Sequence, residues 1–185
     1  MKLKYFVFVP LTLLLVGATG DTYIREGVVT HYGTGYHHNK YGASGLWVDA
    51  YMPIAASRDI PYGTIVEVEN IDPTSRCRGN KVRVMVFDWG PSAQPSVRVF
   101  DMMPSGGFYR YKGRPGIAEK GRGGVEVKLT VVDTSRACNP GRLGNSKQAK
   151  GEYFCLRKNF GYGLEEDEIF WEPHFNKNKE CYPLP

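Results

Sequence analysis

The most constraining feature of the sequence is a strand, turn and strand pattern over residues 81–101. Valine alternates with other residues from 82 to 86, which is the period-two pattern of a strand packed against a core. The Trp-Gly-Pro sequence at residues 89–91 then ends the strand, because proline donates no ladder hydrogen bond and glycine permits a tight turn. A second short strand is expected at residues 97–100. The chain should therefore be built on β-strands joined by rigid turns.

Two carboxylates stand at the ends of these two strands, Asp88 after the first and Asp101 after the second. A carboxylate at a strand end can be partly buried and still reachable, as acid–base catalysis requires. An alternative stays open for Asp88, because aspartate also caps turns through its side chain. We treat both residues as candidate catalytic groups.

The first residues have the character of a secretory signal. Lys2 and Lys4 are followed by an apolar run at residues 6–16 and by small residues at 18–20. This order is typical of a signal peptide over residues 1–20, although an uncleaved anchor is an alternative. Because the apolar run is too short to cross a bilayer, no stable membrane span is expected. The sequence predicts a secreted, periplasmic or extracellular protein.

Composition narrows the class of partner. The chain has 185 residues, 12 of them tyrosine, and a formal net charge of +5. After removal of the signal, the length suffices for one domain with a core, and the composition favours β structure. The mild positive charge suits an anionic wall polymer, whereas the absence of Lys/Arg runs argues against nucleic acid. We expect a monomer without a cofactor.

The cysteine pattern predicts disulfides. There are four cysteines, Cys77, Cys138, Cys155 and Cys181, and an even count in an exported protein indicates two bridges. The three possible pairings stay open, but Cys77 is alone in the first half and must bond to the C-terminal region if all pair within the chain. No C-x-x-C pair occurs, so a zinc or other metal site is not expected.

Further strands are expected at residues 27–33, 65–70 and 125–132, with glycine- and proline-rich connections between them. An aromatic and cationic cluster at residues 108–111 includes Tyr109, which could stack on a sugar or could cover the core. The loop at residues 34–45 contains His37 and His38 as weaker candidates. Short strands without a long helix predict an all-β closed barrel or sandwich.

The order of motifs resembles the double-psi β-barrel of the rare lipoprotein A family and, more distantly, the first domain of expansins. The most diagnostic match is Val-Met-Val-Phe-Asp-Trp-Gly-Pro at residues 84–91, against the family's Val-x-Val-x-Asp-Arg-Gly-Pro. The other matches follow in family order at residues 27–33, 42–46, 54–64, 66–70 and 98–103. The resemblance covers residues 27–132. It implies a six-stranded double-psi barrel over residues 21–133, followed by a disulfide-tied extension over residues 134–185.

The same resemblance implies a function. Characterised family members are lytic transglycosylases that act on peptidoglycan glycan strands. Asp88 then takes the position of the catalytic acid, which protonates the glycosidic oxygen while the sugar's own 6-hydroxyl attacks the anomeric carbon. Asp101 matches a carboxylate that expansins and related barrels keep in the same groove. The predicted substrate contacts are Thr30, Tyr32, Ser57, Trp89 and Tyr109.

Two positions depart from the family pattern. The family's histidine falls on Ser57 and its glutamate falls on Leu46. A serine is no acid or base near neutral pH without an activating partner. Two alternatives therefore stand beside peptidoglycan cleavage. One is an expansin-like protein that binds cell-wall polysaccharide without cleaving it, and the other is a barrel that binds protein as a secreted protease inhibitor does.

Overall fold

The computed structural model describes residues 23–33, 40–45, 47–48, 51–91, 98–109, 116–144 and 155–156. Six strands close into a barrel in the order β1-β7-β4-β6-β5-β8. They are β1 (Ile24–His31), β4 (Ile54–Ala56), β5 (Ile65–Asn70), β6 (Lys81–Asp88), β7 (Arg98–Met102) and β8 (Gly124–Asp133). The predicted all-β, closed six-stranded barrel is confirmed.

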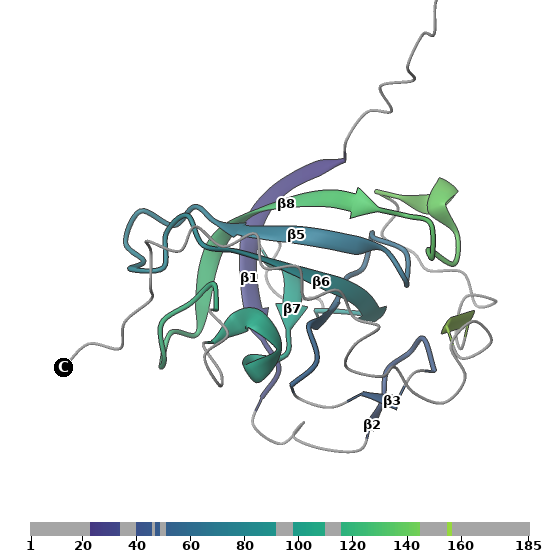
Figure 1. The fold of residues 1–185 in the computed structure, drawn as a ribbon, viewed down its shortest axis with the longest axis horizontal. Helices are drawn as coiled ribbons and strands as arrows, with labels where there is room; N and C mark the ends of the chain where they lie inside the picture. Colours follow the sequence, from purple (N-terminus) through teal and green to yellow (C-terminus); the bar gives the residue numbers. More distant parts are fainter. Residues whose placement is uncertain are drawn as a thin grey trace, which may run out of the picture.

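Both parallel and antiparallel pairs occur in the barrel. β1 pairs with β7 and β4 pairs with β6 in parallel, whereas β4 and β7 lie antiparallel between these two pairs. The hairpin β5–β6 and strand β8 complete the wall, and β8, β5 and β6 run side by side in Figure 1. Parallel pairs require crossover connections, which distinguish this barrel from a simple up-and-down barrel.

The strands follow from the residue pattern. In β6 the three valines are buried, and so are Met85 and Phe87, while β5 and β8 alternate buried with partly exposed residues. β5 and β6 carry an ion-pair ladder on the outer face, in which Lys81 contacts both Glu67 and Glu69. β1 begins at Ile24, three residues earlier than the expected start at Gly27, because its first half pairs with β8.

Small elements lie outside the barrel wall. β2 (Lys40–Tyr41) and β3 (Trp47–Val48) form a separate two-stranded sheet. A short helical segment, η2 (Pro104–Phe108), follows β7 and lies at the end of that strand in Figure 1. One further helical turn is η3 (Pro140–Arg142). Among the described residues, no helix is long and apolar enough to span a membrane.

The segment that follows β8 packs on the barrel. Cys138 and Cys155 form a disulfide, and the neighbouring Leu156 is fully buried in the hydrophobic core. Gly63 permits this contact, because its φ of 86° suits glycine and an added Cβ would collide with the carbonyl of Arg136. A disulfide in the C-terminal region is thus confirmed.

Some sequence predictions lie outside the described residues. The expected signal peptide at residues 1–20 is one, and the histidines His37 and His38 with Leu46 are others. Cys77 is disulfide-bonded, whereas Cys181 lies outside the described part of the chain. The division into residues 21–133 and 134–185 stays a prediction.

Candidate functional site

The two candidate carboxylates flank one small residue. Ala56 on β4 pairs with Asp88 on β6 and with Asp101 on β7. Neighbouring strands lie about 4.8 Å apart, so the two aspartate Cα atoms are separated by roughly 10 Å. Asp101 in turn pairs with Thr30 on β1. We call these four residues, Asp88, Ala56, Asp101 and Thr30, the carboxylate row.

Asp88 is held by three donors. Its Oδ1 accepts the backbone N–H of Ala43 at 2.7 Å and that of Trp89 at 2.8 Å. Its Oδ2 accepts the hydroxyl of Tyr32 at 3.0 Å. Since two backbone donors already occupy Oδ1, a proton on this carboxyl group would sit on Oδ2. The side chain is partly buried, so Asp88 caps the turn and remains reachable at the same time.

Asp101 has one side-chain partner among the described residues. The hydroxyl of Thr30 donates to its Oδ1, and Asp101 is also partly buried. Thr30 and Tyr32 are two residues apart at the end of β1, so alternation along the strand favours the same face for both side chains. The end of β1 therefore supplies a hydroxyl to each carboxylate.

An exposed aromatic ring follows Asp88 directly. Trp89 is 40% exposed, and the guanidinium carbon of Arg58 lies 4.7 Å from the centre of its ring. The Nε of Arg58 also donates to the carbonyl of Pro91 at 2.7 Å. Exposed tryptophan faces pack well against other flat groups, and this one stands at the edge of the carboxylate row.

Ser57 differs from the other predicted contacts because it has no exposed surface. Its hydroxyl donates to Oδ1 of Asp59 at 3.0 Å and accepts the N–H of Ile60 at 3.2 Å. Asp59 is itself ion-paired with Arg25. In this conformation Ser57 serves a buried polar network, and nothing in its surroundings makes it accessible to a ligand.

Tyr109 lies against the end of β1, where its ring packs beside that of His31. Its hydroxyl donates to the carbonyl of Arg122 at 2.7 Å and lies 2.9 Å from Nε2 of His31. Burial raises the pKa of Tyr109. His31, whose ring also packs on Phe108, was not singled out by the sequence, although its place before Tyr32 at a strand end could have marked it. The other cationic and aromatic members of the cluster, Arg110 and Tyr111, lie outside the described residues.

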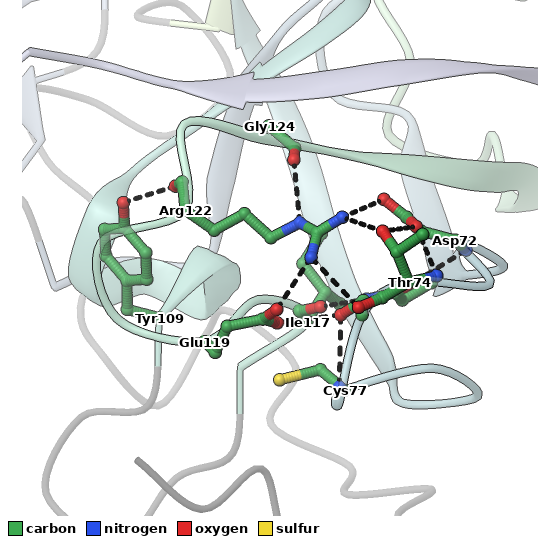
Figure 2. Close-up of polar contacts among 10 residues, drawn as sticks. Asp72, Thr74, Cys77, Tyr109, Ile117, Glu119, Arg122 and Gly124 are labelled. Carbon is green, nitrogen blue, oxygen red and sulfur yellow. Dashed lines mark hydrogen bonds and ion pairs between the residues drawn. The ribbon is translucent and has the colours of Figure 1, made fainter. Parts of the chain in front are cut away.

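A second polar cluster connects the loops near the first residues of β6, at the end of this strand that lies opposite Asp88. Figure 2 shows the guanidinium of Arg122 between two acidic groups: it contacts Asp72 at 2.5 Å and Glu119 at 2.8 Å. It also donates to Oγ1 of Thr74 at 2.6 Å and to the carbonyl of Gly124 at 3.2 Å. Arg122 thus joins the β5–β6 connection to the segment that enters β8.

The charges in this cluster shift the protonation equilibria of its members. Burial works against ionisation of Asp72, but hydrogen bonds from Thr74 and the charge of Arg122 outweigh it and lower the pKa of Asp72. The pKa of Glu119 is lowered in the same way, against burial, by hydrogen bonds from its own backbone, Ser75 and Arg122. Burial opposes the charge on Arg122, yet the two acids raise its pKa. Arg122 pairs with both acids of this cluster, so we expect the cluster to stabilise the fold.

The described residues include no group of three or more His, Cys, Asp or Glu side chains that could hold a metal ion. What the carboxylate row offers instead is acid–base chemistry. It combines one carboxyl group fixed by three donors with a second one across Ala56, next to an exposed indole.

Comparisons with known proteins bear on this arrangement. No protein-family model matches the chain. The chain is similar to a protein of Treponema pallidum (strain Nichols) described as probable endolytic peptidoglycan transglycosylase RlpA. The two are 36% identical over 76 residues, which is 41% of this chain and 22% of that relative. The resemblance to the rare lipoprotein A family is confirmed for this stretch, and the chain spans less than a quarter of the relative's length. The likeness to expansins stays a prediction.

Among solved structures, the chain is similar to the Streptomyces papain inhibitor (SPI), with a TM-score of 0.40 and 23% identity. The match covers 60% of this chain and 96% of the inhibitor. The barrel assignment does not depend on this likeness, since it rests on the strand pairing of the chain itself.

Proposed function

We propose that this chain acts on cell-wall polysaccharide and cleaves the glycan strands of peptidoglycan as a lytic transglycosylase, with Asp88 as the general acid. The observation that carries the proposal is the fixed carboxyl group of Asp88, whose Oδ1 is occupied by two backbone donors while Oδ2 meets only the Tyr32 hydroxyl among the described residues. A general acid must present one oxygen in a defined direction, and this geometry does so. The similarity to a probable peptidoglycan transglycosylase supports the choice of substrate.

The chemistry needs one proton donor and one acceptor. Oδ2 of Asp88 gives its proton to the glycosidic oxygen, and the bond between that oxygen and the anomeric carbon breaks. The 6-hydroxyl oxygen of the same sugar bonds to the anomeric carbon and loses its proton, which returns to the Asp88 carboxylate. The product is an anhydro sugar, and no water is consumed. A single carboxyl group that changes from acid to base is sufficient.

The other members of the row would assist. Asp101, held by Thr30, is placed across Ala56 where a negative charge can stabilise the positive charge that develops at the anomeric carbon. Trp89 offers an exposed ring for a neighbouring sugar. Because Ser57 is buried, the proposed mechanism gives it no step and differs here from a scheme that uses a histidine.

The proposal includes the location of the protein outside the cytoplasm. Cleavage of peptidoglycan requires export, which agrees with the signal peptide expected at residues 1–20. We propose a monomer that is secreted or periplasmic after removal of that segment, with Asp88, Asp101, Thr30, Tyr32 and Trp89 at the substrate.

The test is incubation of the purified mature protein with peptidoglycan sacculi and with peptide-stripped glycan strands, followed by mass analysis of the products. We expect anhydro-ended sugars from the wild type. Asp88→Asn should reduce their rate by at least about 100-fold, in the range expected for loss of a general acid. Glu126→Gln on the exposed face of β8 is the matched control and should leave the rate unchanged.

Other products would change the conclusion. Hydrated reducing ends would show a hydrolase in place of a transglycosylase. If no product forms but the protein still sediments with sacculi, the cleavage proposal is refuted. The protein would then bind glycan without cleaving it, at the surface around Trp89. That second candidate is favoured by the exposed indole itself, which needs no catalytic group.

A further inference from the structure

The side chain of Arg58 is held in one orientation by two contacts. Its Nε donates to the carbonyl of Pro91 at 2.7 Å, and its guanidinium lies over the ring of Trp89 at 4.7 Å. Both partners belong to the turn that follows Asp88. Arginine carries five N–H donors, and only the one on Nε has a partner among the described residues. The other four donors have no partner in the described part of the chain, and the plane of the cation is held by these two contacts.

The charge of Arg58 is also uncompensated in the described part of the chain. Other arginines of the barrel, such as Arg25, Arg83 and Arg122, form ion pairs, whereas Arg58 forms none with a described residue. Its side chain is partly buried, which costs hydration of the charge. A cation that is fixed, partly desolvated and unpaired is suited to an anionic ligand, because the planar fork of arginine binds a carboxylate through two parallel hydrogen bonds.

The position of this cation relative to the carboxylate row gives the ligand class. The backbone N–H of Trp89 donates to Oδ1 of Asp88, and Arg58 comes two residues after Ala56 in the sequence. A neutral sugar would need no cation at this edge. An acidic sugar would be repelled by the negative charge of Asp101 unless a positive group held its own carboxylate.

We propose that Arg58 and Trp89 form a subsite for a sugar that bears a carboxylate, with the ring packed at the indole and the carboxylate paired with the guanidinium. The inference rests on the proposed function, since it takes the carboxylate row as the site where the glycan lies. It adds a specificity-determining residue that acts on the ligand's charge. The carboxylate can belong to a lactyl-bearing amino sugar of a peptide-stripped strand or to a uronic acid.

The test measures binding by titration calorimetry in the full chain carrying Asp88→Asn, so that ligands are not consumed. The probes are peptide-stripped glycan oligosaccharides with free lactyl carboxylates, the same oligosaccharides after methyl esterification, oligogalacturonate and neutral chitohexaose. We expect the free acid to bind about tenfold more tightly than its ester, as a charge-assisted pair implies. Tight binding of oligogalacturonate would identify uronic acid as a source, and weak binding would assign the lactyl-bearing sugar.

Three further substitutions make the test specific. Arg58→Gln should remove the tenfold preference and leave chitohexaose binding within twofold, whereas Trp89→Leu should weaken all the sugars. Arg76→Gln removes the same charge from the exposed β5–β6 connection, about 25 Å away along β6, and should keep the preference. Equal affinity for acid and ester in the parent protein would overturn the inference, and so would a preference that survives Arg58→Gln.

The result separates this inference from the proposed function. If the wild type releases anhydro sugars but binds acid and ester equally, cleavage stands and the subsite is refuted. If the preference is found and depends on Arg58 while no product forms from sacculi, the subsite stands and the catalytic proposal is refuted.

Discussion

The hydroxyl of Tyr32 donates to Oδ2 of Asp88 across 3.0 Å, although 56 residues separate the two in the sequence. Tyr32 follows β1, and Asp88 ends β6, so the contact exists only because the barrel closes. The Tyr32 hydroxyl can donate to the carboxylate or accept from the protonated acid. It therefore controls the one oxygen of Asp88 that two backbone donors leave open.

Tyr32→Phe tests whether this hydroxyl positions Asp88. We expect kcat for the release of anhydro sugars to fall about 10- to 100-fold, because the proton donor loses its orientation, while KM changes less than twofold. Tyr23→Phe is the control, since its hydroxyl contacts Asp59 in the buried network. If KM rises and kcat is kept, the hydroxyl contributes to substrate binding alone and does not position the acid.

The strands were the part of this molecule that the sequence could predict. The valine alternation of β6 and the mixed pattern of β5 indicate strands directly, because the side chains of one strand alternate between its two faces. β4 (Ile54–Ala56) gives no such signal, because its three residues are all buried and show no alternation. Only the neighbours β6 and β7 decide its conformation.

The site could be predicted less well than the strands. Asp88 and Asp101 were identified from their positions at strand ends, but their placement on either side of Ala56 depends on register between three strands. Ser57 is buried with Asp59, which forms an ion pair with Arg25. No local sequence pattern predicts this ion pair. Long-range pairing of polar groups is the information that a single sequence does not show.

The Arg122 cluster predicts a large effect on stability. Its side chain joins Asp72 to Glu119, and both acids are mostly shielded from solvent. Arg122→Gln would leave two partly buried carboxylates without their cation and should lower the free energy of unfolding by about 2–4 kcal/mol. Urea denaturation followed by tryptophan fluorescence measures this. The exposed Arg76→Gln should change the free energy by less than about 0.5 kcal/mol; a similar small loss in Arg122→Gln would show that the cluster contributes little.

The same cluster predicts acid sensitivity. The pKa values of Asp72 and Glu119 are lowered in the folded state from ordinary values of 3.8 and 4.5, so the folded protein binds fewer protons there than the unfolded chain. Their contribution to stability is fully present above those ordinary values and is lost as pH falls through the folded-state pKa values. Urea midpoints measured from pH 7 to pH 2.5 should therefore drop mainly below about pH 4.5. Arg122→Gln should flatten that drop, and an unchanged acid slope in this variant would contradict the assignment.

The disulfides give the last prediction. Cys138 and Cys155 are paired and Cys77 is also bonded, which leaves Cys181 as the remaining cysteine of the sequence. We expect non-reducing proteolysis and mass analysis to show one linked peptide pair with Cys138 and Cys155, and a second with Cys77 and Cys181. Replacing Cys138 and Cys155 together by serine should lower the free energy of unfolding by about 3 kcal/mol, because a 17-residue separation closes a short loop.

This double variant also tests the role of the segment after β8. Leu156 lies beside Cys155 and is fully buried in the barrel core, so loss of the bridge should loosen its packing near Gly63. Hydrogen exchange should increase around residues 60–64 and 136–138 while β5 and β6 stay protected. If exchange instead rises evenly over the whole barrel, the bridge acts on global stability alone and this segment does not open as a local unit.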